Sequence, residues 1–145
     1  MKEELMSFER CKNEFLKKVE IDEGKIQSMM KIAELDMQVI SGIEVSTVSA
    51  SKLAKDYYEV IQELLTALLL AYGTKSSNHE CLIAFFKEKY PSYEYEVRVM
   101  HELKNIRNKI SYYGYFVEVS YIKQNLLEFK HIIELLKKLI NEKVP

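Results

Sequence analysis

The sequence predicts an all-α protein, an antiparallel up-and-down bundle of five to six helices. Apolar residues recur every three to four positions along most of the 145 residues, as on the buried side of a helix. No segment alternates convincingly between apolar and polar residues as a strand does. Only four Gly and two Pro occur, and most of them separate the periodic segments: Gly42, Gly73, Pro91 and Gly114. We therefore expect residues 1–145 to form a single helical domain.

Three helices are expected in the first half of the chain. The first spans about residues 3–21, where apolar residues recur at near-helical spacing. The second spans about residues 22–40, and the Asp22 carboxylate can cap it by accepting hydrogen bonds from the amides of the first turn. The third begins at residue 49 or 51 and ends at Tyr72. It carries a wide apolar stripe and is followed by Gly73, a residue type that commonly terminates helices.

Three more helices are expected in the second half. Ser77 and Glu80 form a capping box, in which each side chain binds the backbone amide of the other, and the short helix that follows ends before Pro91. A fifth helix runs from residue 92 or 93 to about 113. A sixth runs from about residue 117 or 121 to 141, with its apolar residues in helical register.

Charge and targeting signals exclude several classes of protein. The 21 basic and 22 acidic residues give a net charge of −1, so any contact with RNA must be local and the whole molecule is not attracted to nucleic acid or anionic membranes. The N-terminus lacks the charged-then-apolar pattern of a leader. The longest apolar run, about residues 64–72, is too short to span a bilayer. We expect a soluble cytoplasmic protein without membrane contacts.

The cysteines and histidines do not predict a cofactor or metal site. Cys11 and Cys81 are far apart in the sequence, which favours reduced, packed thiols over a disulfide framework or a metal knuckle. His101 is a single histidine with no acid or cysteine at ligand spacing and is interpreted as structural or exposed, while His79 lies inside a helix cap and His131 within the last helix. There is no Gly-rich phosphate loop and no nucleophile elbow. We expect no cofactor and no metal bound by the protein.

The segment from Arg107 to Gly114 combines a cation, amides, a hydroxyl and two phenols at a helix end. On a helical wheel Arg107 lies at the edge of the apolar stripe, with Ser111 one turn further along. A guanidinium there can bind a phosphate or carboxylate through two hydrogen bonds, while phenols can stack on bases. The alternative is a solvated face on which Arg107 makes an ordinary surface ion pair. The polar side of the wheel holds His101, Lys104, Asn105, Asn108 and Tyr112.

Two regions resemble the HEPN family of small helical domains. One is Ala54-Lys55-Asp56-Tyr57-Tyr58-Glu59-Val60 with the following Leu68-Leu69-Leu70-Ala71-Tyr72-Gly73, Ser77-Asn78-His79 and Leu82-Ile83-Ala84-Phe85-Phe86. It resembles the family's long tyrosine-bearing helix, loop and short helix. The other is Leu103-Lys104-Asn105-Ile106-Arg107-Asn108-Lys109-Ile110, which resembles the helix that carries the family's signature.

The signature is an Arg, usually followed by a polar residue, with a His five positions after the Arg. Arg107 and Asn108 match, but Tyr112 stands at the His position. In ribonuclease members these residues meet near a dimer interface and cut RNA without a metal. An unperturbed Tyr, with a pKa near ~10, is a poor acid or base at neutral pH, so binding survives this change more readily than catalysis. Some members are toxins whose nucleotidyltransferase antitoxins modify a Tyr two residues after the His, a position that is Gly114 here.

The resemblance and the residues together leave three functions open. The first is a homodimeric, HEPN-like domain in a toxin-antitoxin or RNA-defence system. It would bind RNA or a nucleotide-containing ligand through Arg107 and Tyr112, with further contacts from Lys104, Asn108, Ser111 and Tyr113. The second is a metal-independent ribonuclease in which Arg107 works with Tyr112, or with His101 of a second chain. The third is a protein-interaction module in which Arg107 and the tyrosines only stabilise a dimer or hetero-complex.

Overall fold

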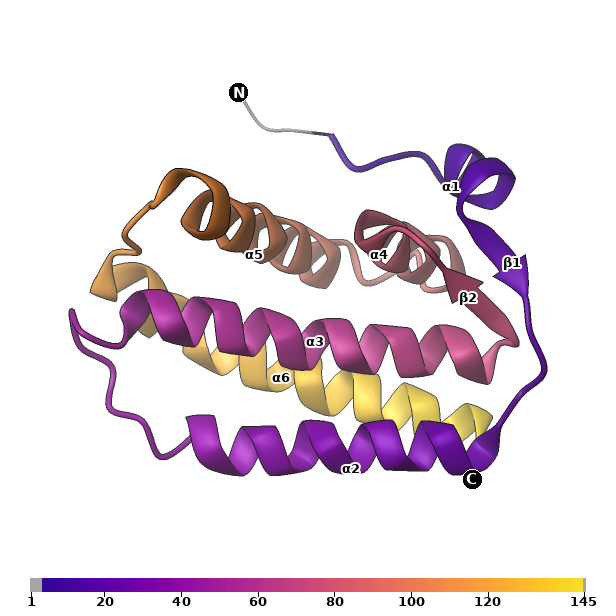
Figure 1. Cartoon of the computed structure of the whole chain (residues 1–145), viewed down its shortest axis with the longest axis horizontal. Helices are drawn as coiled ribbons and strands as arrows, with labels where there is room; N and C mark the ends of the chain where they lie inside the picture. The colour runs from indigo at the N-terminus through magenta and orange to yellow at the C-terminus, as the bar shows by residue number, and fades with distance from the viewer. Residues whose placement is uncertain (1–3, 145) are drawn as a thin grey trace.

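The computed structural model describes residues 4–144 and confirms the all-α class. Over these residues the chain forms six helices and one two-stranded sheet (Figure 1). In chain order the elements are α1 Phe8–Glu14, β1 Leu16–Lys18, α2 Glu23–Ile40, α3 Ala50–Ala71, β2 Thr74–Ser76, α4 His79–Lys89, α5 Glu94–Tyr113 and α6 Val119–Lys143. None of the described helices combines the length and apolar character needed to cross a membrane.

Helix α3 is the centre of the bundle and packs against α2, α4, α5 and α6. Its apolar residues occupy more than one side of the helix, which is the pattern of a helix surrounded by neighbours. Tyr57, Leu64, Leu65 and Leu68 are each at most 1% exposed. The ring of Tyr57 packs on Phe129 of α6 with centroids 5.5 Å apart.

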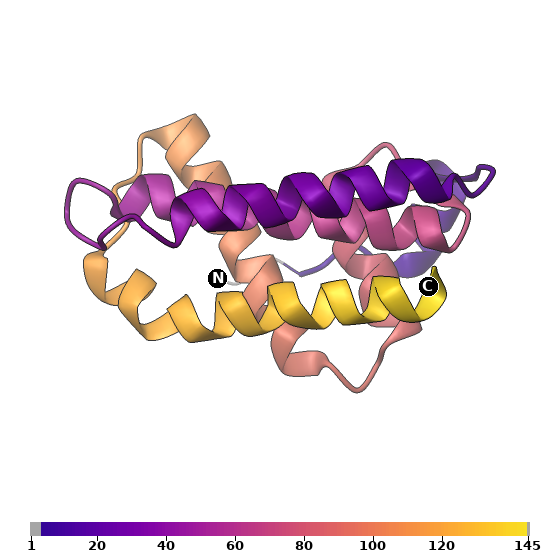
Figure 2. The ribbon, with the colours of Figure 1, turned by 90° about the horizontal axis from the view of Figure 1, so that it is seen from below.

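The chain passes back and forth along the long axis of the molecule (Figure 1). Helix α2 runs antiparallel to α3. Helices α4 and α5 follow one another in the direction opposite to α3, and α6 runs in the same direction as α3. Figure 2 shows α5 crossing the α3 and α6 pair at a steep angle. Because of this crossing, α5 contacts both α3 and α6.

The first helix is shorter than expected. The sequence predicted one helix over residues 3–21, but α1 covers only Phe8–Glu14 and is followed by β1; Glu3 lies outside the described residues. Strand β1 pairs antiparallel with β2, with Leu16 opposite Ser76. The turn at Gly73, which has a φ of +69°, directs β2 toward this pairing. A long-range strand pair therefore replaces the second half of the predicted helix.

The other predicted helices are confirmed with small shifts at their ends. Asp22 caps α2 as expected, because its Oδ1 accepts a hydrogen bond of 3.0 Å from the amide of Lys25. Gly114 ends α5 in the left-handed conformation with a φ of +64°. Helix α6 continues two residues beyond the predicted residue 141.

Candidate functional site

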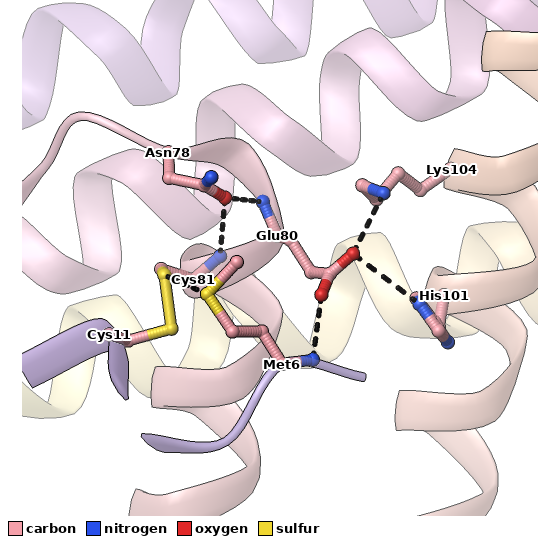
Figure 3. A network of polar contacts seen from close by, with 7 residues as sticks. All are labelled: Met6, Cys11, Asn78, Glu80, Cys81, His101 and Lys104. Atoms are coloured by element: carbon pink, nitrogen blue, oxygen red, sulfur yellow. Dashed lines mark hydrogen bonds and ion pairs between the residues drawn. A yellow bond between two sulfur atoms is a disulfide. The ribbon is translucent and has the colours of Figure 1, made fainter. Parts of the chain in front are cut away.

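The carboxylate of Glu80 is the centre of a polar network between the N-terminal segment, α4 and α5 (Figure 3). Its Oε2 accepts a hydrogen bond of 2.6 Å from the backbone amide of Met6. Its Oε1 accepts one of 3.1 Å from Nζ of Lys104 and lies 3.9 Å from Nε2 of His101. The three side chains are only 12–19% exposed. Two side chains that the helical wheel assigned to the polar side are therefore held inside the molecule by one acid.

Asn78, and not Ser77, caps the helix that presents Glu80. The Asn78 Oδ1 accepts hydrogen bonds from the amides of Glu80 and Cys81, at 2.8 and 3.3 Å. Ser77 instead bonds the carbonyl of Phe15 through its amide and its hydroxyl. The predicted capping box is thus wrong by one residue. The reason is that the strand pairing holds Ser77 against the N-terminal segment, which leaves Asn78 at the helix end and the Glu80 carboxylate available for other contacts.

Cys11 and Cys81 form a disulfide, which corrects the expectation of two reduced thiols. Both residues are fully buried, with Ala84 beside them, and the Met6 sulfur lies 3.6 Å from Sγ of Cys81. The bond ties α1 to α4 beside the Glu80 network (Figure 3). Two cysteines 70 residues apart carry no local pairing signal, and their proximity results from the long-range pairing of β1 with β2.

Arg107 lies between the core and solvent on the face of α5 that packs on α3. Its side chain is 31% exposed, and its terminal nitrogen NH2 lies 4.0 Å from Oε1 of Glu59, a side chain that is itself 61% exposed. The buried Nε has no hydrogen-bond partner among the described residues. A long contact to one exposed carboxylate leaves most of the donors of the guanidinium available to a further anion.

Tyr58 connects Arg107 electrostatically to the Glu80 network. This tyrosine of α3 is 2% exposed. Burial raises the pKa of its phenol to about 12; the charge of Arg107 opposes this shift and that of Glu80 adds to it. The phenol is therefore neutral at physiological pH. It lies in the electric field of both charged groups.

The aromatic residues that follow Arg107 do not pack into a corner of the core. Tyr112, Tyr113 and Phe116 are 75%, 84% and 85% exposed, and Tyr115 is 44% exposed with Nζ of Lys109 6.0 Å from its ring centroid. We call these four aromatic residues the aromatic end of α5. Four exposed rings around one helix terminus form an apolar surface of the kind that binds another molecule.

The predicted site residues do not all lie together. Lys104 belongs to the Glu80 network, and Arg107 lies near Glu59 and Tyr58. Asn108 is partly buried, while Ser111, Tyr112 and Tyr113 are exposed at the helix terminus. Tyr112 is five residues beyond Arg107, about 140° further around the helix, so a regular helix does not bring these two side chains together.

Sequence reasoning missed the residues on α3 and α4 that surround Arg107 and Lys104. The local pattern around Glu80 indicated only a helix cap, although its other contacts come from residues 74 positions before it and 24 positions after it. Tyr58 is buried in α3, and the neighbouring Glu59 is 61% exposed. No spacing rule marked them as neighbours of Arg107.

The fold and the site together define an all-α bundle with a partly buried network around Glu80, a partly exposed arginine and an exposed aromatic end. Comparison of the chain with family models, curated proteins and solved structures finds no match. The functional interpretation therefore depends on the geometry of these residues and on the resemblance to the HEPN family described above.

Proposed function

We propose that this protein is a HEPN-like domain that binds single-stranded RNA or a nucleotide-containing ligand through Arg107 and the aromatic end of α5. The observation that carries the proposal is the exposure, each at least 75%, of Tyr112 and Tyr113 at the end of the helix that also presents Arg107, and of Phe116 just after it. Exposed aromatic rings stack on bases and stabilise binding by about 1–3 kcal/mol per base. The guanidinium supplies a planar pair of donors for a phosphate.

The net charge of −1 limits this binding to a few phosphates. For single strands each neutralised phosphate contributes about −0.7 to the slope of log affinity against log salt. We expect a slope of about −0.7 to −1.4, from one or two phosphate contacts in the Arg107 region. Such a ligand would be held mainly by stacking.

The test measures fluorescence anisotropy of a labelled single-stranded RNA over a range of salt concentrations. Arg107→Ala is expected to weaken binding and to make the salt slope shallower by about 0.7. Arg98→Ala is the matched control, because Arg98 is an exposed residue of the same helix whose guanidinium lies 5.8 Å from the ring centroid of Tyr95. Equal losses in both variants, or no binding by the unaltered protein, would reject the proposal.

A metal-independent ribonuclease is the second candidate, supported by the HEPN resemblance around Arg107. Its acid or base would be Tyr112, which is 75% exposed, or His101 of a second chain. His101 is 12% exposed and lies beside Glu80, so a second chain could use it only after this segment had rearranged. Tyr112→His restores the family pattern and should create metal-independent cleavage of RNA if this candidate is correct.

A homodimer joined through the aromatic end belongs to the same proposal. Burying the rings of Tyr113 and Phe116 against their symmetry copies would remove a large apolar surface from water and bring two copies of Arg107 toward one groove. In a toxin-antitoxin setting the same surface would meet a nucleotidyltransferase-like partner. Light scattering of the protein and of Phe116→Ser tests the dimer, since the variant should shift the equilibrium toward monomer.

The cytoplasmic location expected from the sequence is also part of this proposal. The Cys11–Cys81 disulfide bears on it, because cytoplasmic proteins usually keep their cysteines reduced. Trapping the thiols in intact cells and counting the alkylated cysteines by mass spectrometry gives the answer. A fully oxidised pair in vivo would contradict an ordinary reducing compartment.

A further inference from the structure

A second cluster of polar side chains lies where the start of α5 meets α6, away from Arg107. Glu96 is in the first turn of α5, and Glu128 and His131 are one turn apart on α6. Glu96 is about 16 Å along the helix from Arg107. Residues three apart on a helix share a face, so Glu128 and His131 both project toward Glu96. One donor atom from each of the three residues lies within 4.8 Å of the other two.

The spacing of these donors is close to that of ligands around one metal ion. Nε2 of His131 lies 3.2 Å from Oε2 of Glu96. Two ligands of a tetrahedral ion, each about 2.0–2.1 Å from the metal, are about 3.3 Å apart. The nearest pair already has this separation. Since all three donors lie within 4.8 Å of one another, the third donor has to move by at most about 1.5 Å, which rotation of a glutamate side chain supplies.

Charge and burial at this cluster also favour a cation. The Glu96 side chain is 15% exposed, and Oε1 of Glu128 is buried with no hydrogen-bond partner among the described residues. A buried carboxylate oxygen without a donor is unfavourable, and a second carboxylate nearby adds repulsion. One protonated imidazole would neutralise only one of the two acids. A divalent ion would neutralise both acids.

We propose that Glu96, Glu128 and His131 bind one divalent transition-metal ion, with zinc as the test ion. Imidazole and carboxylate ligands together suit zinc and related ions. Three protein ligands leave at least one coordination position for water or a ligand oxygen. His131 is 53% exposed, so that position is accessible from solvent. Glu128 and His131 are only three residues apart in the sequence, but the third member of the site, Glu96, comes from another helix.

The experiment titrates zinc into tag-free protein by calorimetry, after a thiol assay has verified that the Cys11–Cys81 disulfide is intact and cannot supply ligands. We expect one zinc ion per chain. Glu96→Gln, Glu128→Gln and His131→Gln should each weaken binding at least about tenfold. Two controls should bind as the unaltered protein does. They are His79→Gln, which changes an exposed histidine beside Gln62, and Glu134→Gln, which changes an exposed acid of α6.

A second readout separates loss of a ligand from loss of the fold. Without metal, Glu128→Gln should melt at the same temperature as the unaltered protein or higher, because the change removes a repulsive charge. With zinc, the melting temperature should rise in the unaltered protein and not in the variant. The proposal is overturned by absence of one-to-one binding. It is also overturned if the glutamate variants keep full affinity, or if His79→Gln loses as much affinity as His131→Gln.

Discussion

Nζ of Lys104 donates a hydrogen bond of 3.1 Å to Oε1 of Glu80, and this ion pair joins α5 to α4 where only 13% and 19% of the two side chains are exposed. The same carboxylate accepts the amide of Met6. One acid thus holds three separate parts of the chain together. Removing one partner of a partly buried pair leaves the other charge incompletely compensated, which costs more than the loss of a surface pair.

Lys104→Met should therefore lower the free energy of unfolding by about 1–3 kcal/mol. Its matched control is Lys52→Met, because Lys52 is 64% exposed and pairs with Asp56 at the same distance of 3.1 Å. The control should change stability by less than about 0.5 kcal/mol. Urea denaturation followed by circular dichroism measures both values. Equal effects of the two substitutions would show that the buried network adds no particular stability.

Reduction of the Cys11–Cys81 disulfide should lower stability by roughly 2–4 kcal/mol, because the bond closes a long loop and restricts the unfolded chain. Urea midpoints with and without reductant test this. The double variant Cys11→Ala, Cys81→Ala serves as the control, since its midpoint should not respond to reductant. If reductant does not change the urea midpoint of the unaltered protein, the prediction is contradicted.

Stability should fall at alkaline pH because Tyr58 keeps its proton longer in the folded state than in the unfolded state. Burial, the largest cause, raises its pKa from 10.0 to about 12. Below pH 10 the phenol is neutral in both states and its contribution is fully present. Between about pH 10 and 12 the unfolded chain loses the proton first, so stability falls by about 1.4 kcal/mol per pH unit from this group.

Tyr58→Phe should make this alkaline loss shallower, whereas Tyr95→Phe should not, since Tyr95 is 52% exposed. Unfolding free energies measured at several pH values provide the comparison. Burial also raises the pKa of Tyr90 and Tyr121, so the variant should retain part of the pH dependence. Identical profiles for Tyr58→Phe and the unaltered protein would contradict the assignment.

The aromatic end should affect binding without affecting the fold. Tyr112→Ser combined with Tyr113→Ser should change the unfolding free energy by less than about 0.5 kcal/mol, because both rings are exposed. Phe129→Ala, which removes a fully buried ring, should cost about 3–5 kcal/mol. If the double variant unfolds like Phe129→Ala, the tyrosines belong to the core. If it folds normally and loses RNA binding, the proposed surface is supported.

Local patterns predicted most of the helices, since periodicity, the Asp22 cap and the glycines at 73 and 114 act within a few residues of the elements they define. They failed where a segment distant in the sequence determines the local structure. The sequence pattern predicted helix for residues 16–18, but in the structure they form a strand because residues 74–76 pair with them. A helical wheel assigned Lys104 and His101 to the polar side of α5. It could not show that Glu80 would draw Lys104 and His101 into the molecule.

The candidate site was predictable only where its residues are consecutive. Arg107 and the tyrosines after it stand out in the sequence because their polar and aromatic groups lie within one short segment. The disulfide and the cluster of Glu96, Glu128 and His131 each join positions that no single spacing connects. Such sites depend on how elements pack, and the sequence of one element does not show which other element packs against it.

The disulfide also determines how the molecule responds to cutting and pulling. Helices α2 and α3, with the loop between them, lie inside the covalent ring that Cys11 and Cys81 close. One protease cut within this ring leaves both pieces on a single molecule until a reductant separates them. A pulling force applied at the two ends of the chain passes directly from α1 to α4 through the sulfur bridge, so the central helix carries none of it through its own backbone.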